Sequence, residues 1–186
     1  SGWTSDDNKP TGVNTKTPIW NVSGNSVTQT ENSHVAVLQS DFEIESNNYS
    51  GEFNAVTSSG NDDDAFGFVL GYDDDGVNGT DDGFILIDWN RLGDNHGQMG
   101  LKSAGLAASF VQGQNIEGAN FWGHTGDVTE IARSNNFGST GFTSGVSNNF
   151  KFTVNGDNLQ TFVDDVLEFD IDASDLGLDE FPIDSF

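Results

Sequence analysis

The chain has 186 residues, with 30 acidic side chains, 6 basic ones and a formal net charge of −24. This length suits a single domain, and the charge excludes ordinary nucleic-acid binding, which needs lysine and arginine to displace counterions from phosphates. Docking onto anionic lipid is disfavoured for the same reason. The 15 Phe, 4 Trp and 2 Tyr supply a core and argue against a disordered chain.

The composition also indicates the environment in which the protein is found. The chain has no cysteine, and therefore neither disulfides nor a thiolate metal site. No apolar run approaches the roughly 18 residues of a membrane helix, so we expect no direct membrane insertion. A cysteine-free, very acidic chain rich in Gly, Asn, Ser, Thr and Asp is typical of an extracellular module stabilised by calcium. It begins without a signal-peptide pattern and reads as a module excised from a longer protein.

In chain order, residues 1–17 resemble an arm or linker, and residues 18–186 are expected to form one domain. Short apolar stretches bounded by Gly, Asn, Asp and Ser recur roughly every 8 to 15 residues, which predicts an all-β sandwich or barrel. The expected strands are Val35–Gln39, Tyr49–Thr57, Ala65–Tyr72, Gly83–Asn90, Asp127–Arg133, Asn149–Val154 and Leu159–Ile171.

Two of these stretches and the segment 134–149 carry a finer prediction. The run Phe84-Ile-Leu-Ile-Asp-Trp89 is apolar almost throughout, which predicts a central strand covered on both faces. Phe150–Val154 alternates, so one face is buried, and Asn155-Gly-Asp-Asn158 predicts a hairpin turn after it. Residues 134–149 are interpreted as a long loop, either functional or poorly ordered.

Eight aspartates fall between positions 62 and 82 and flank the apolar strand 65–72. The ends of that strand lie roughly 25 Å apart at about 3.3 Å per residue, so one metal ion cannot bridge both groups. The later group encloses the short loop 76–80, across which its carboxylates can converge. The residues concerned are Asp62, Asp63, Asp64, Asp73, Asp74, Asp75, Asp81 and Asp82, with Asn78 inside the loop.

Hard oxygen donors in flexible loops suit Ca²⁺, which takes 6 to 8 oxygen ligands. The pattern is not an EF-hand, because no glutamate follows at the required spacing. The alternative is that the aspartates are turn formers and solubilising charge. Eight in one stretch favours calcium, since neighbouring uncompensated carboxylates cost free energy. We therefore predict at least two Ca²⁺ ions, with the 73–82 loop as the site that faces the ligand.

The stretches Asn61–Tyr72 and Gly83-Phe-Ile-Leu-Ile-Asp-Trp-Asn-Arg91 resemble the C-terminal domain of thrombospondins. Three further stretches match in order: Val27–Ser33, Trp122-Gly-His-Thr-Gly-Asp127 and Asn149–Ile171. The resemblance covers residues 18–172. It implies an antiparallel β-sandwich of the jelly-roll, concanavalin A-like type, with the acidic triplet 62–64 as calcium-site residues.

Bacterial domains of this kind occur as ligand-binding modules in large, type I-secreted (RTX-type) adhesins. The resemblance thus implies an extracellular, cell-surface location and calcium-dependent binding of peptides or of glycans. The family pattern continues into a closing strand that this chain does not contain, so we expect an open sheet edge.

The candidate ligand-binding residues are Asn90, Arg91, His124 and Asp127. Arg91 follows an apolar strand and either pairs with a ligand carboxylate or with a neighbouring aspartate. His124 lies in the motif shared with thrombospondins and is either a ligand contact or a turn residue. Asp127 rests on the same resemblance. Trp122 either stacks on a ligand or belongs to the core.

The stretch Glu168-Phe-Asp-Ile-Asp172 resembles the strand of alternating carboxylates that β-sandwich glycosidases present to the sugar bond. Here Asp172 stands where the acid/base glutamate should be, and exposed-face acids explain the pattern equally well. The three histidines, His34, His96 and His124, lack the spacing of a zinc site. We therefore expect no catalytic activity.

Together these observations predict a calcium-dependent adhesion module of a large secreted bacterial adhesin, monomeric when isolated. Its expected partners are peptide or protein termini on a target cell surface. The alternative is a calcium-dependent glycan-binding lectin domain, and a glycoside hydrolase or a structural spacer is less favoured.

Overall fold

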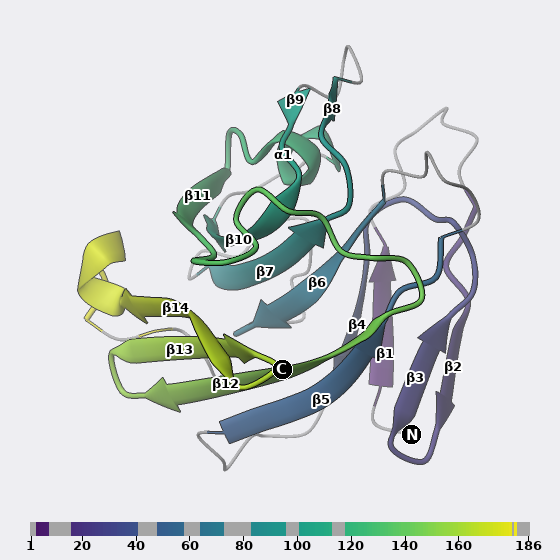
Figure 1. Cartoon of the computed structure of the whole chain (residues 1–186), viewed down its shortest axis with the longest axis horizontal. Helices are drawn as coiled ribbons and strands as arrows, with labels where there is room; N and C mark the ends of the chain where they lie inside the picture. Colours follow the sequence, from purple (N-terminus) through teal and green to yellow (C-terminus); the bar gives the residue numbers. More distant parts are fainter. Residues whose placement is uncertain are drawn as a thin grey trace.

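The computed structural model describes residues 3–7, 16–40, 48–57, 64–72, 83–95, 101–112, 118–179 and 181. Two four-stranded antiparallel sheets are packed as a sandwich (Figure 1), which confirms the predicted all-β fold class. Sheet 1 contains, in spatial order, β11 (Val128–Arg133), β10 (Gly105–Val111), β7 (Phe84–Asn90) and β6 (Ala65–Leu70). Sheet 2 contains β14 (Val166–Asp172), β13 (Asn158–Val163), β12 (Ser147–Asn155) and β5 (Asn48–Asn54).

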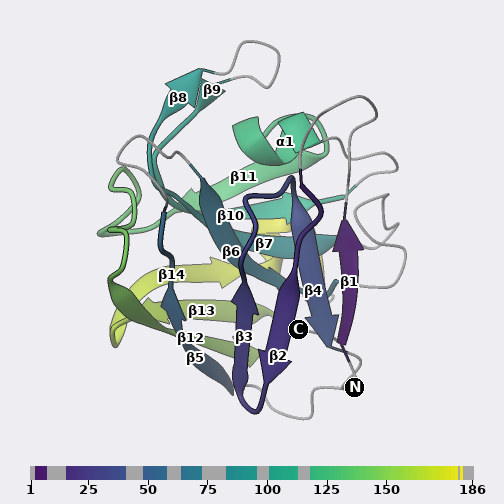
Figure 2. The same cartoon turned by 90° about the vertical axis from the view of Figure 1, so that its right-hand side faces the viewer.

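Three two-stranded sheets and two short helices complete the described part. The strands are β1 (Trp3–Asp7) with β4 (Ala36–Ser40), β2 (Trp20–Ser23) with β3 (Ser26–Gln29), and β8 (Asp94–Asn95) with β9 (Leu101–Lys102). The helices are α1 (Gly118–Gly123) and the 3-10 helix η3 (Ala173–Leu176). Strands β1 to β4 lie along one flank of the sandwich (Figure 2). Among the described residues, no helix is long and apolar enough to cross a membrane.

The core between the two sheets is built largely from aromatic rings. Phe68 of β6 lies with its ring centroid 5.0 Å from Phe150 and 5.1 Å from Phe152, both on β12. Phe66 is stacked on Phe53 and lies 6.1 Å from Trp89. Aromatic pairs in such tilted and offset arrangements contribute beyond the area they bury. The alternation predicted for Phe150–Val154 is the reason that β12 sends Phe150 and Phe152 into this core.

Strand β7 is buried on both faces, as its continuous apolar run predicted. Ile85, Ile87 and Trp89 point into the sandwich core. Phe84 packs in a second cluster on the opposite face of sheet 1, and Leu86 packs against that cluster. We call this opposite face, turned away from sheet 2, the outer face of sheet 1. Further residues of the outer cluster come from the neighbouring strands, from β4 and from α1: Tyr72, Val111, Val128, Val37, Val69 and Phe121.

All seven predicted strand stretches overlap an observed strand, and two differences have clear causes. The stretch Leu159–Ile171 forms two strands, because Asp164 and Asp165 adopt positive φ angles of 48° and 65° and make a tight hairpin. Strand β10 was not predicted. Its sequence Gly-Leu-Ala-Ala-Ser-Phe-Val is rich in small residues of low strand propensity. Pairing with β7 on one side and β11 on the other makes it a strand.

The loop that follows β11 is fixed by one buried carboxylate. Glu168 of β14 is 1% exposed and lies at a register shift, without a partner opposite it in the β13–β14 ladder. It accepts hydrogen bonds from Ser134 Oγ (2.5 Å), Asn136 N (2.9 Å) and Asn136 Nδ2 (2.9 Å). Asp170, by contrast, is exposed and accepts from Asn158 Nδ2. The glycosidase-like alternation of β14 therefore does not place these carboxylates together in a groove.

Replacing Glu168 by alanine is expected to destabilise the protein by about 3 kcal/mol, because the buried Ser134 hydroxyl and two N–H donors of Asn136 lose their acceptor. Asp170→Ala on the same strand is the matched control and should change stability by no more than about 0.5 kcal/mol. Chemical denaturation monitored by tryptophan fluorescence measures both. Equal effects of the two substitutions would contradict the assigned role of Glu168.

Candidate functional site

Asp88 is a carboxylate near the middle of the outer face of sheet 1. It is 6% exposed. In the strand register its neighbours on that face are Gly67 of β6 and Ala107 of β10, so nothing larger than a methyl group flanks it. A Cβ at Gly67 would lie 2.2 Å from the backbone oxygen of Ile87, so only glycine fits there. A buried carboxylate of this kind needs hydrogen bonds and countercharge.

A β-bulge in β11 brings the next two charged residues onto the same face. Glu130 is opposite Ser109 and Arg133 is opposite Ala107, while Ile131 has no partner in the ladder. Without the extra residue, positions three apart in a strand would point to opposite faces. With it, Arg133 donates from Nε to Glu130 Oε1 (2.8 Å) and from Nη2 to Glu130 Oε2.

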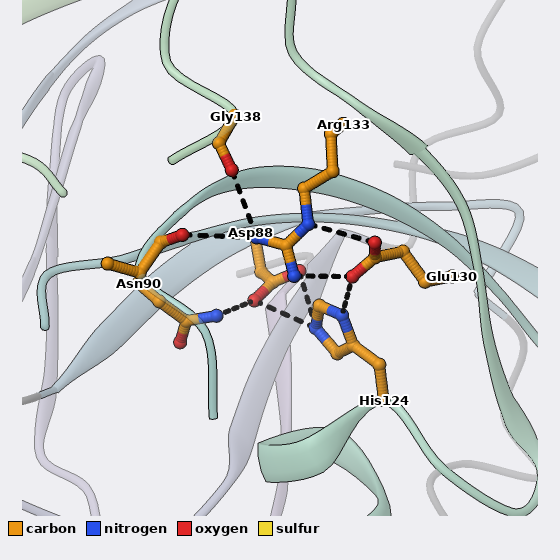
Figure 3. Close-up of polar contacts among 7 residues, drawn as sticks. Asp88, Asn90, His124, Glu130, Arg133 and Gly138 are labelled. Carbon is orange, nitrogen blue, oxygen red and sulfur yellow. Dashed lines mark hydrogen bonds and ion pairs between the residues drawn. The ribbon is translucent and has the colours of Figure 1, made fainter. Parts of the chain in front are cut away.

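His124 joins Asp88 to Glu130. It follows α1 directly, with a left-handed backbone (φ 47°), and its side chain is 5% exposed. Nε2 lies 3.1 Å from Asp88 Oδ1 and 3.2 Å from Oδ2, and Nδ1 lies 2.8 Å from Glu130 Oε2. Asn90 Nδ2 donates to Asp88 Oδ2 at 3.0 Å. Figure 3 shows the imidazole of His124 between Asp88 and Glu130, with the guanidinium of Arg133 beside Glu130.

This geometry favours the imidazolium form of His124, because each ring nitrogen faces a carboxylate and needs a proton to donate. Burial alone would lower the pKa of His124, but the hydrogen bonds and charges of Asp88 and Glu130 outweigh it and raise the pKa above its usual 6.5. For Glu130, burial acts to raise the pKa, and Arg133 and His124 more than offset this and lower it below 4.5. The network is therefore a set of ionised, mutually neutralising groups.

A cavity of about 480 Å³ opens above these side chains. One wall is apolar, with Leu101 69% exposed on β9 and Trp122 on α1. Behind that wall, Lys102 Nζ lies 3.7 Å from the centre of the Trp122 ring. The residues around the cavity come from β7, the β9–β10 connection, α1, β11 and the loop after β11: Asn90, Leu101, Ser103, Ala104, Trp122, Gly123, His124, Glu130, Arg133, Gly138 and Ser139. We call this cavity the His124 pocket.

Two of the four predicted ligand-binding residues, Asn90 and His124, line the His124 pocket. Arg91 is not among its lining residues, and its Nη1 donates to Thr57 Oγ1 at 2.9 Å. Asp127 is exposed in the turn before β11, where its backbone oxygen accepts from Gln112 N. Ligand contacts by Arg91 and Asp127 stay predictions.

The sequence reading did not single out Asp88, Glu130 or Arg133. A signal for Asp88 was present, because an aspartate inside a strand buried on both faces must have a partner nearby. No comparable signal existed for Glu130 and Arg133, since their common face depends on the bulge. In a regular strand, their spacing of three residues would place Glu130 and Arg133 on opposite faces.

The predicted calcium ligands lie almost wholly outside the described residues. These are Asp62, Asp63, Asp73, Asp74, Asp75, Asn78, Asp81 and Asp82. Asp64 is described, and its backbone oxygen accepts from Arg91 N at 3.2 Å, next to the end of the ladder where Ala65 is opposite Asn90. Within the described ranges, no group of three or more His, Asp or Glu residues is arranged to hold a metal ion. Calcium binding by the acidic stretches stays a prediction.

Comparison with known proteins adds a structural likeness only. No protein-family model matches the sequence, and no curated protein matches it either. The chain is similar to a solved structure, the carbohydrate binding module CBM66 from Bacillus subtilis, with a TM-score of 0.56. Identity is 15%, over 92% of this chain and 80% of that chain. At this identity the likeness establishes a shared β-sandwich fold, and the thrombospondin-type family stays a prediction.

The His124 network is expected to make the stability of the protein fall on both the acid and the alkaline side of a pH optimum. The raised pKa of His124 means that its contribution is fully present below pH 6.5 and is lost as pH rises through the folded-state pKa. The lowered pKa of Glu130 means that its contribution is present above pH 4.5 and is lost as pH falls through its folded-state value. Stability from this network is therefore greatest between these two limits.

Denaturant unfolding from pH 4 to pH 9, with NMR titration of the His124 ring, measures this dependence. His124→Gln should flatten the alkaline limb, and His34→Gln is the matched control that should leave it in place. An unchanged alkaline limb in His124→Gln would show that the imidazolium does not stabilise the fold.

Proposed function

We propose that this chain is a glycan-binding module whose ligand occupies the His124 pocket. The observation that carries the proposal is the pairing of an apolar wall, Leu101 and Trp122, with a charged floor of Glu130 and Arg133. A sugar ring has the complementary surface, since its C–H face is apolar and its hydroxyl edges hydrogen-bond with carboxylate and guanidinium groups. The likeness to a structure described as a carbohydrate binding module supports the same class of ligand.

A glycan is preferred over the peptide ligand that the sequence reading favoured. The residue-level support for a peptide was the ability of Arg91 to pair with a terminal carboxylate. The guanidinium of Arg91 donates to Thr57, and Arg91 is not among the residues that line the His124 pocket. A glycan ligand is supported both by the His124 pocket and by the likeness to a carbohydrate binding module.

We propose binding without catalysis at this pocket. A glycosidase needs one carboxylic acid that is protonated and a second carboxylate across the sugar bond. Glu130 is held ionised by Arg133 and His124, which lower its pKa and make it a poor proton donor. Asp88 is buried beneath His124. Neither carboxylate has the freedom that the reaction requires.

The proposal retains calcium as a stabilising ion. The acidic stretches 62–64 and 73–82 carry eight aspartates, and the whole chain offers 6 basic side chains against 30 acidic ones. Calcium at extracellular concentrations would neutralise these stretches, and its binding energy would add to the free energy of folding. This role fits an extracellular module of a secreted, cell-surface adhesin.

Binding is tested on an array of polysaccharides and oligosaccharides, with Leu101→Ser as the diagnostic variant. Leu101 is exposed, so the substitution should leave the fold intact while removing part of the apolar wall. We expect affinity for the captured glycan to fall about fivefold to tenfold. Val166→Ser, another exposed apolar residue, lies on β14 outside the pocket and should bind like the unmodified protein. Capture of no glycan, or equal losses in both variants, would refute the proposal.

Calcium is tested by thermal unfolding with and without a chelator. Removal of bound calcium should lower the melting temperature by about 5 to 10 °C, the shift that corresponds to an ion near 100 times its Kd. Returning calcium should restore the midpoint, and returning magnesium at the same concentration is the control. A midpoint that the chelator leaves unchanged would rule out a stabilising calcium.

A further inference from the structure

The cationic groups of the His124 pocket are already occupied within the protein. Arg133 makes four hydrogen bonds, two to Glu130 and two from Nη1 to the backbone oxygens of Ala104 (3.2 Å) and Gly138 (3.3 Å). A guanidinium has five N–H donors, so at most one remains. Both ring nitrogens of His124 face carboxylates. Sites that bind carboxylate or sulfate instead present a free arginine fork.

The charges of the described residues around the pocket cancel. Asp88 and Glu130 carry two negative charges, and His124 and Arg133 carry two positive ones while His124 is protonated. Behind the apolar wall, Lys102 adds one positive charge and is buried (1% exposed). Asp94, opposite Lys102 in the β8–β9 ladder, adds one negative charge. The local sum is zero, and loss of the His124 proton makes it negative.

The net negative charge of the whole chain also repels an anionic ligand. The formal net charge is −24, and its field extends over about 8 Å at physiological ionic strength. An acidic glycan would approach against this field and would find no net positive charge in the pocket. Its binding is therefore penalised both on approach and at the site.

The hydrogen-bonding groups that remain available in the pocket suit ligand hydroxyl groups. Glu130 receives three hydrogen bonds, and a carboxylate accepts about four. Its side chain is partly exposed, and Ser103 and Ser139 also line the pocket. A sugar hydroxyl can donate to Glu130 and exchange hydrogen bonds with the serines. A ligand carboxylate can only accept, and next to Glu130 it would add like-charge repulsion.

We propose that the His124 pocket selects uncharged glycans and discriminates against acidic ones. This inference rests on the proposed function and adds the chemical class of the ligand. The selectivity comes from the internal neutralisation of Arg133 and His124 by Glu130 and Asp88. A free guanidinium in the same position would give the opposite preference.

The test compares three forms of each polysaccharide on one array: the native neutral form, the form oxidised to a carboxylate at C6, and the methyl ester of that carboxylate. The ester has the bulk of the carboxylate without its charge. For a backbone that binds, we expect the ester to retain most of the affinity and the carboxylate to bind at least about tenfold more weakly. Raising NaCl from about 0.05 to 0.5 M should reduce the difference in affinity between the ester and the carboxylate, because salt screens the repulsion between the protein and the ligand carboxylate.

Glu130→Gln provides a second arm. It leaves the pocket with a net positive charge and releases one donor of Arg133, because the glutamine keeps only one acceptor oxygen, so discrimination against the carboxylate form should fall about tenfold. Glu52→Gln removes the same charge from the chain at an exposed position on β5 and should keep the discrimination. A thermal melt verifies that both variants fold. If Glu130→Gln does not fold, the ester comparison on the unmodified protein still decides.

The outcomes separate the two proposals. Capture of no glycan in any form refutes the proposed function and this inference with it. Capture of a glycan whose carboxylate form binds as well as its ester refutes the inference alone. A loss of binding in both the ester and the carboxylate forms would assign the effect to bulk rather than charge, and would also overturn it.

Discussion

The carboxylate of Asp88, held near the centre of a strand that is buried on both faces, sets the arrangement of the residues around it. In that position it requires a cation, and the nearest is the imidazole of His124 at 3.1 Å. An imidazole with carboxylates at both nitrogens is stable as the imidazolium, so Glu130 completes the arrangement and Arg133 in turn neutralises Glu130. His124 follows α1 directly, so these contacts also hold the end of that helix over sheet 1 (Figure 3). The pocket is the space left above this set of charges.

Two β-bulges position charged side chains at and behind the pocket. The shift in β11 brings Glu130 and Arg133 to one face, and the shift in β14 leaves Glu168 unpaired in its ladder, where it holds the loop after β11. That loop supplies Gly138, whose oxygen accepts from Arg133, so the two bulges act on the same wall of the pocket. Each gives a charged side chain, Arg133 in β11 and Glu168 in β14, a position that regular strand alternation would not. The fold and the candidate site are therefore joined through local irregularities, whereas the regular strands supply the core.

The excess of carboxylates in this chain calls for two different kinds of countercharge. At the pocket, carboxylates are neutralised by His124 and Arg133, with distances of 2.5 to 3.2 Å between the hydrogen-bonded atoms of His124, Arg133 and the two carboxylates. Over the whole chain, 30 acidic side chains stand against only 6 basic ones, so most carboxylates have no cationic side chain available. Calcium is the proposed countercharge for those. If both hold, metal would govern stability while side-chain cations govern ligand choice, and the two properties could be varied separately.

The sequence by itself determined the fold class and most of the strands, because apolar alternation and turn residues act over a few positions and need no knowledge of distant partners. It also indicated Asn90 and His124, through a motif and a strand end. It could not predict β10, whose small residues become a strand only between β7 and β11. It could not bring Glu130 and Arg133 together, because a one-residue bulge reverses the face that spacing assigns. Tertiary structure decided the site because its chemistry depends on register, and register is fixed by which strands pair.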